Sequence, residues 1–268
     1  MIDLHVHLLP GLDDGCGTLE ETVALANYLT SEGIKHAVAT VHHLPGVYEI
    51  PPETVSEALT RTREALEIGG IPLEVTVANE IMIQQGLAER VRSGELTGIG
   101  KMKHYALVEF SSREIPWFAF TTLEHMTELG VIPIVAHPER CYPLHRDIAE
   151  LRAWYSKGIL AQLDLGSLLG IHGTRVQRFA EYLVRNHLIH LLGSDLHSPP
   201  PIPDLWARAY RRIAKLGGQE YACIIADDLP RAVLEDEDIG RIVPSPRHAK
   251  RYSLGTLASS LLGYASKD

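Results

Sequence analysis

The chain has 268 residues, of which 25 are lysine or arginine and 34 are aspartate or glutamate, so its formal net charge is −9 with histidine neutral. Hydrophobic residues make up 45% and charged residues 22% of the chain, which is typical of a globular protein and excludes a disordered or collagen-like polymer. The acidic balance argues against a protein that coats nucleic acid or binds anionic membrane surfaces.

Apolar runs and turn residues predict a regular alternation of strands and helices along the chain. The predicted strands cover residues 2–6, 36–41, 73–78, 105–110, 131–136, 160–165 and 188–193. The predicted helices cover residues 18–31, 52–67, 117–129, 147–157 and 174–186, with a weaker segment after residue 80 and closing helices at 203–215 and 219–225. Thr18 and Glu21 have the spacing of a capping box at the start of the first helix.

Several of the predicted strands are almost uniformly apolar. Residues 131–136, for example, read Val-Ile-Pro-Ile-Val-Ala. A strand without polar alternation is buried on both faces, as in a parallel sheet that helices cover on both sides. Seven such strands with intervening helices therefore predict an α/β fold, and the length of the chain is ample for a single α/β barrel.

The composition changes near residue 229. Before that point the chain shows no internal repeat and no linker, so residues 1–228 are expected to form one domain. Residues 235–238 are all acidic, and they are followed by a stretch rich in proline and basic residues and by an end rich in serine, glycine and leucine. We expect residues 229–268 to be a flexible C-terminal extension.

The sequence predicts a cytoplasmic protein without membrane insertion. No run of about eighteen apolar residues is present, and the first seven residues contain an aspartate and two histidines where a signal peptide would have an apolar run. Cys16, Cys141 and Cys223 are odd in number and lack CxxC spacing, which fits a reducing compartment and offers neither a disulfide framework nor a zinc knuckle.

Metal-ligand residue types stand at the carboxyl ends of nearly all predicted strands. They are His5, His7, His42, His43, Glu80, Glu109, His137, Asp195 and His197. Only the sixth strand lacks one at its very end, although Asp164 is close by. A single residue of this kind is usually structural, but loops at this end of a parallel barrel converge on one mouth, so the whole set predicts a metal centre.

The spacing of these residues favours shared ions. His5 and His7 face the same side of their strand because side chains alternate, and Asp195 and His197 repeat that spacing. Asp13-Asp14, after the first strand, adds a carboxylate. Imidazole and carboxylate ligands without thiolate suit manganese, iron or zinc. The number of ligands predicts two or three ions that share a bridging carboxylate.

Such a cluster lowers the pKa of a bridging water and stabilises charge on a phosphoryl group. Arg140, three residues after His137, offers the bidentate donors that bind phosphate, and the alternative for Arg140 is a surface salt bridge. His43 is either a second phosphate contact or proton donor, or a residue that orients its neighbour His42.

Eight short motifs follow one another along the chain. They are Met-Ile-Asp-Leu-His-Val-His at 1–7, Leu-Pro-Gly-Leu-Asp-Asp-Gly at 9–15, Ala-Thr-Val-His-His at 39–43, Ala-Asn-Glu at 78–80, Leu-Val-Glu-Phe at 107–110, Ala-His-Pro-Glu-Arg at 136–140, Gly-Ser-Leu-Leu-Gly at 166–170 and Gly-Ser-Asp-Leu-His at 193–197. Together they resemble the polymerase-and-histidinol-phosphatase (PHP) superfamily. The long first motif and the Gly-Ser-Leu-Leu-Gly segment are similar to its bacterial tyrosine-protein phosphatases of capsular and exopolysaccharide synthesis.

The resemblance, which covers roughly residues 1–228, implies a distorted seven-stranded (β/α)7 barrel with three metal ions, usually manganese. Carried over to this sequence, it implies a first ion at His5, His7, Glu80 and Asp195, a second at Glu80, Glu109 and His137, and a third at Asp14, His42 and His197. Glu80 would then bridge the first two ions, and Arg140 would bind the phosphate. Asp13 is the alternative to Asp14.

The activity that the resemblance implies is hydrolysis of phosphotyrosine on a protein tail, with a bacterial tyrosine kinase of exopolysaccharide or capsule synthesis as the expected partner. A metal-bridging hydroxide would attack phosphorus in line. The tyrosinate is a good leaving group because the pKa of a phenol is about 10. Members of the family can also associate, so self-association of this chain is a further expectation.

Other readings of the same residues remain open. Within the superfamily, a small phosphomonoester such as histidinol phosphate is the main alternative substrate. An amidohydrolase also begins with HxH, but it needs a carboxylated lysine at the end of the fourth strand, where this chain has Glu109. A cysteine phosphatase is disfavoured because Cys141 and Arg146 are one residue too close. A metal-binding regulator with little turnover would not need the intact ligand set.

Overall fold

The computed structural model describes residues 1–200, 202–237 and 239–246. Seven parallel strands form one sheet in which each strand pairs with its neighbours in sequence. They are β1 (Ile2–Val6), β2 (His36–His43), β3 (Glu74–Met82), β4 (Tyr105–Glu109), β5 (Ile132–Ala136), β6 (Leu160–Asp164) and β7 (Leu191–Gly193). A parallel bridge between Val6 and Leu196 joins the two edges, so the sheet curls into a nearly closed barrel. The predicted seven-stranded α/β barrel is confirmed.

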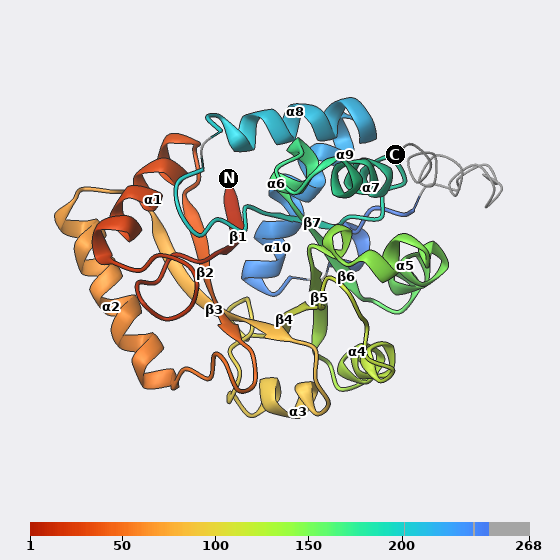
Figure 1. Cartoon of the computed structure of the whole chain (residues 1–268), viewed down its shortest axis with the longest axis horizontal. Coiled ribbons are helices and arrows are strands. Elements are labelled where there is room, and N and C mark those ends of the chain that lie inside the picture. The colour runs from red at the N-terminus through yellow and green to blue at the C-terminus, as the bar shows by residue number, and fades with distance from the viewer. Residues whose placement is uncertain (201, 238, 247–268) are drawn as a thin grey trace, which may run out of the picture.

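Helices alternate with the strands and surround the barrel (Figure 1). They are α1 (Leu19–Ser31), α2 (Pro52–Ile68), α3 (Leu87–Arg92), α4 (Ala119–Glu128), α5 (Ile148–Ser156), α6 (Leu165–Leu169), α7 (Thr174–Arg185), α8 (Leu205–Gly217), α9 (Gln219–Cys223) and α10 (Leu229–Glu235). The predicted capping box is present, since the Thr18 hydroxyl accepts the Glu21 N–H and the Glu21 carboxylate accepts the Thr18 N–H, both at 3.3 Å. Within the described residues, no helix combines the length and the apolar character needed to cross a bilayer.

Two elements differ from the prediction in ways that matter for the site. β3 runs through Glu80 to Met82, because it pairs along this stretch with both β2 and β4. The short helix α6 was not predicted. The Asp164 side chain starts α6 by accepting the N–H groups of Gly166 and Ser167, and Gly170 ends it with a positive φ of 89°.

The residues of β1 divide between the two faces of the sheet. Side chains alternate along a strand, so Leu4 and Val6 face the surrounding helices while Asp3 and His5 face the barrel interior. All four are buried. The polar residues of the interior are therefore held inside an apolar shell, which fixes their positions from outside.

The helix α10 continues the core beyond the predicted domain boundary at residue 228. Leu229 and Val233 are fully buried, and α10 packs against β1 and β7. The Lys101 N–H, before β4, donates to the Leu234 carbonyl at 3.2 Å, which places α10 at the amino ends of the strands. Residues 247–268 of the predicted extension lie outside the described residues.

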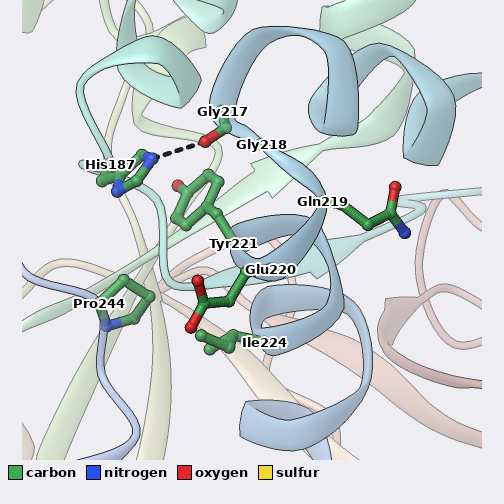
Figure 2. A pocket seen from close by; sticks show the side chains of 8 residues that line it. All are labelled: His187, Gly217, Gly218, Gln219, Glu220, Tyr221, Ile224 and Pro244. Carbon is green, nitrogen blue, oxygen red and sulfur yellow. Dashed lines mark hydrogen bonds between the residues drawn. The ribbon is translucent and has the colours of Figure 1, made fainter.

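A cavity of about 400 Å³ lies beside α8 and α9 (Figure 2). His187 lines this cavity and stacks on Tyr221 with ring centroids 4.0 Å apart. It belongs to none of the groups of possible metal ligands found among the described residues. Because His187 precedes β7, this cavity lies toward the amino ends of the strands. The predicted ligands follow the strands at the opposite end of the barrel.

Candidate metal centre

Three overlapping groups of side chains gather at the carboxyl ends of the strands, each with ligand atoms within 4.8 Å of one another. The groups are His5, His7, Glu80 and Asp195; His42, Glu80 and Glu109; and His7, Asp14, His42 and His197. His137 adjoins them through its Nε2 atom, which lies 2.9 Å from Glu80 Oε1. The structure thus brings together all the residues that the resemblance implies as ligands of the three ions.

The orientation of two imidazoles in the first group is fixed by oxygen acceptors behind them. His5 Nδ1 lies 2.8 Å from Gln162 Oε1, and His7 Nδ1 lies 2.9 Å from Asp13 Oδ2. Each Nδ1 therefore carries the ring hydrogen, and each Nε2 presents a lone pair. These two Nε2 atoms are 3.3 Å apart, and each lies 3.1 Å from Glu80 Oε2.

Lone pairs that face one another at such distances call for a cation between them. Glu80 Oε2 is buried without a hydrogen-bond partner among the described residues. Asp195 Oδ1, 3.1 Å from His5 Nε2, supplies a further oxygen. A set of two imidazoles and two carboxylates suits manganese, iron or zinc, so the residues present fit a metal ion.

The third group converges on one carboxylate oxygen of Asp14. Asp14 Oδ1 lies 3.4 Å from His42 Nε2 and 3.3 Å from His197 Nε2. The other nitrogen of His197 lies 3.0 Å from the Asp195 carbonyl oxygen and donates to it, which leaves a lone pair on Nε2. Asp14, His42 and His197 therefore offer an oxygen and two nitrogens to one position.

Asp13 plays a different part from Asp14. Besides facing His7, its carboxylate accepts the backbone N–H groups of His42 at 3.0 Å and of Gly15 at 3.0 Å. These contacts use its oxygens to orient the ring of His7 and the backbone of His42. The geometry favours Asp14 as the candidate ligand and Asp13 as the residue that orients its neighbours.

His42 touches two of the groups with different nitrogens. Its Nδ1 lies 3.2 Å from Glu109 Oε1, while its Nε2 faces Asp14. A neutral imidazole has one lone pair, so His42 can serve only one ion. With that lone pair on Nε2, the remaining position is left to Glu80, Glu109 and His137.

Strained backbone sets the direction of two of these side chains. His137 follows β5 with a φ of 32°, and Asp195 follows β7 with a φ of 49°. A residue with a Cβ in this left-handed region costs about 1–2 kcal/mol. Such strain persists where the surrounding structure fixes it, as at functional sites.

The charges of the centre oppose the effect of burial on its pKa values. Burial lowers the pKa of His5, but the negative charges of Glu80 and Asp195 outweigh it and raise this pKa well above its usual range. Burial likewise raises the pKa of Glu80, but the charge of His5 and the contacts of three histidines bring it well below its usual range. Protons and metal ions therefore compete for the same atoms, and acid disfavours metal binding.

Arg140 is brought to the centre and His43 is not. The Arg140 guanidinium, in the turn η1 (Pro138–Arg140), donates to the Asp195 carboxylate. His43 points to the opposite face of β2 from His42, since adjacent side chains alternate. There its Nε2 lies 3.1 Å from Arg90 Nη2 in a separate cavity of about 500 Å³. We therefore remove His43 from the candidate site.

Gln162, which holds the ring of His5, was not predicted from the sequence. Gln162 is buried in β6, two residues before Asp164 and so on the same face. It was predictable, because a buried amide that points toward the barrel interior needs a polar partner there.

Close packing at the seam of the barrel supports His5 from another side. A Cβ atom added at Gly193 would lie 2.6 Å from His5 Cβ and 2.9 Å from Gln162 Cδ. We expect Gly193→Ala to displace His5, to lower the free energy of unfolding by about 1–3 kcal/mol and to lower metal content. Elemental analysis and thermal unfolding measure both effects. Gly69→Ala, whose Cβ would approach no atom closer than 3.2 Å, is the control and should keep its metal.

The sequence profile of the capsular polysaccharide synthesis family CpsB/CapC matches residues 1–235. The chain belongs to this family. The matched region ends with the last residue of α10, so the family's domain includes the helix that covers the amino ends of the strands.

Similar proteins carry names that describe an activity. The chain is 31% identical to the tyrosine-protein phosphatase YwqE of Bacillus subtilis over 246 residues. This match covers 92% of this chain and 96% of YwqE. It is 28% identical to the tyrosine-protein phosphatase CpsB of Streptococcus pneumoniae, over 88% of this chain and 99% of CpsB. A solved structure from work on YwqE and CpsB, described as metal-dependent tyrosine phosphatases, superposes with a TM-score of 0.86 at 30% identity and covers 94% of this chain and 100% of the other.

Proposed function

We propose that this protein is a metal-dependent phosphatase that hydrolyses phosphotyrosine on a protein substrate. The observation that carries the proposal is the convergence of lone pairs from His5, His7 and Glu80 on one point, with the Arg140 guanidinium bound to Asp195 of the same group. Names of relatives that cover nearly the whole chain support the same activity.

The residues of this chain would hold two to three divalent ions, with manganese as the proposed metal and iron or zinc as alternatives. His5, His7, Glu80 and Asp195 would hold one, Glu80, Glu109 and His137 a second, and Asp14, His42 and His197 a third. When bound, such ions activate water at neutral pH and offset negative charge on a phosphoryl group. Gln162 and Asp13 keep the ligating rings in place by accepting their second N–H.

Arg140 would bind the phosphoryl oxygens. Its guanidinium is partly exposed at the mouth, and its present partner Asp195 is one of the proposed ligands. When Asp195 contributes its charge to an ion, the fork of the guanidinium can accept an oxyanion with two parallel hydrogen bonds. A tyrosinate then departs without a strong proton donor, because the pKa of a phenol is about 10.

The proposed substrate is the tyrosine-phosphorylated tail of a bacterial kinase of capsule or exopolysaccharide synthesis, and the proposed location is the cytoplasm. The family to which the chain belongs supports the link with capsule synthesis. We also propose that the chain associates with itself.

Metal removal tests the proposal directly. We expect purified protein to contain two to three metal ions per chain by elemental analysis, and to lose hydrolysis of a phosphotyrosine peptide in chelator. Return of manganese should restore the activity. Metal-replete protein that hydrolyses histidinol phosphate but no phosphotyrosine peptide would move the assignment to a small phosphomonoester, and a replete protein that hydrolyses neither would contradict a phosphatase.

A further inference from the structure

Two cationic side chains converge on Asp164, the last residue of β6. Asp164 Oδ2 lies 2.7 Å from His172 Nε2 and 3.9 Å from Arg140 Nη1. The Asp164 side chain is 2% exposed, whereas the side chains of His172 and Arg140 are 36% and 33% exposed. An imidazole and a guanidinium thus share one buried oxygen at the mouth of the barrel, and both remain accessible to a ligand.

The Asp164 carboxylate is held in one orientation. Its Oδ1 accepts the N–H of Gly166 at 2.7 Å, and its Oδ2 accepts the N–H and the hydroxyl of Ser167 at 3.2 and 3.0 Å. These bonds come from the first turn of α6, so the carboxylate cannot rotate without breaking the helix cap. The ring of His172, in the loop between α6 and α7, is positioned by this fixed partner.

The carboxylate of Asp164 favours the protonated form of the His172 ring. The contact with Asp164 raises the pKa of His172 against the effect of burial, which favours the protonated ring. Arg140 and protonated His172 then face the single charge of Asp164. Asp195, which also accepts a hydrogen bond from Arg140, lies in the proposed ligand group.

We propose that Arg140 and His172 both contact the phosphoryl group, with His172 as the second cationic contact. Asp164 is the residue that positions the ring of His172. A guanidinium binds two oxygens of a phosphoryl group, which leaves a third oxygen for a neighbouring donor. The inference rests on the proposed function, which identifies the bound anion as a phosphoryl group.

Binding of inorganic phosphate to the manganese-loaded protein, measured by calorimetry, tests the inference without any need for turnover. His172→Gln keeps a donor for Asp164 but removes the charge. We expect it to weaken phosphate binding by about fivefold to tenfold, because charge-assisted hydrogen bonds are roughly twice as strong as neutral ones. Metal content and the unfolding temperature should stay at the wild-type values, and with a phosphotyrosine peptide KM should rise more than kcat falls.

Two further variants separate charge from structure. His172→Lys restores a cation that can reach Asp164, and it should recover most of the lost affinity. His125→Gln is the matched control, because His125 also pairs with a carboxylate, 3.2 Å from Glu89 Oε1, but belongs to α4, away from the mouth. We expect His125→Gln to bind phosphate as the wild type does.

The outcomes distinguish this inference from the proposed function. Equal phosphate affinity in the wild type and His172→Gln would overturn the role of His172, as would a His172→Lys variant no better than His172→Gln. Wild-type protein that binds phosphate but hydrolyses no phosphotyrosine peptide would contradict the proposed function, while the role of His172 would still be decided by the binding data. Absence of phosphate binding by the loaded wild type would overturn the inference itself.

Discussion

Glu80→Gln is expected to lower phosphotyrosine hydrolysis by more than about a hundredfold and to remove at least one metal ion per chain. Glu80 has one oxygen 3.1 Å from the Nε2 atoms of His5 and His7, and the other 2.9 Å from His137 Nε2. Within the described residues, no other carboxylate contacts His5 and His7 with one oxygen and His137 with the other. Loss of its charge therefore affects two ion positions together, and even supporting residues of metal sites cost tenfold to a hundredfold in affinity.

The measurement is elemental analysis together with steady-state kinetics. Glu139→Gln is a matched control for metal content, because Glu139 is equally buried and follows β5 near the centre, yet belongs to none of the three groups. It should keep the wild-type number of ions. Full metal content in Glu80→Gln would contradict the bridging role of this carboxylate.

Arg140→Ala is expected to keep its metal and to lower kcat/KM by more than about tenfold. A charge-assisted contact contributes roughly 1.5–3 kcal/mol, and 1.4 kcal/mol corresponds to a factor of ten in rate. Arg140→Lys should recover only part of the loss, because an ammonium group keeps the charge but lacks the planar fork that binds two oxygens.

Kinetics and metal content must be measured on the same preparations, since Arg140 also contacts Asp195. Arg90→Ala provides the control: Arg90 is a partly buried arginine paired with Glu95 on the outer side of the barrel, 3.1 Å from His43. It should leave kcat/KM unchanged. If Arg140→Ala keeps wild-type kinetics, Arg140 does not bind the phosphoryl group.

The strands and most of the centre were predictable because the signals are local. Apolar runs marked the buried strands, and ligand-type residues stood beside their carboxyl ends, which meet in any parallel barrel. The alternation rule that placed His5 and His7 together, and Asp195 and His197 together, also separates His42 from His43. The position of His43 on the outer face of β2 therefore follows from the sequence itself.

Other features depend on contacts between distant parts of the chain. The pairing of His172 with Asp164 needs the short helix α6 to turn the chain back, and five helical residues are too few for a periodic pattern. The placement of α10 depends on its contacts with β1 and β7, from the other end of the domain. No local pattern near residue 229 reports those contacts.

The seam between β1 and β7 has a consequence for folding. Among the described residues, one isolated bridge, between Val6 and Leu196 just after β7, joins the two edges of the sheet, yet His5 and His7 on one side and Asp195 and His197 on the other reach toward common points. An ion bound there would link β1 to the segment that follows β7. It would thereby close a very long loop of the chain, which the backbone hydrogen bonds at this seam close only weakly. Loss of the metal would then loosen the barrel at this seam first, and the amide hydrogens of β1 and β7 would exchange with solvent before those of β3 and β4.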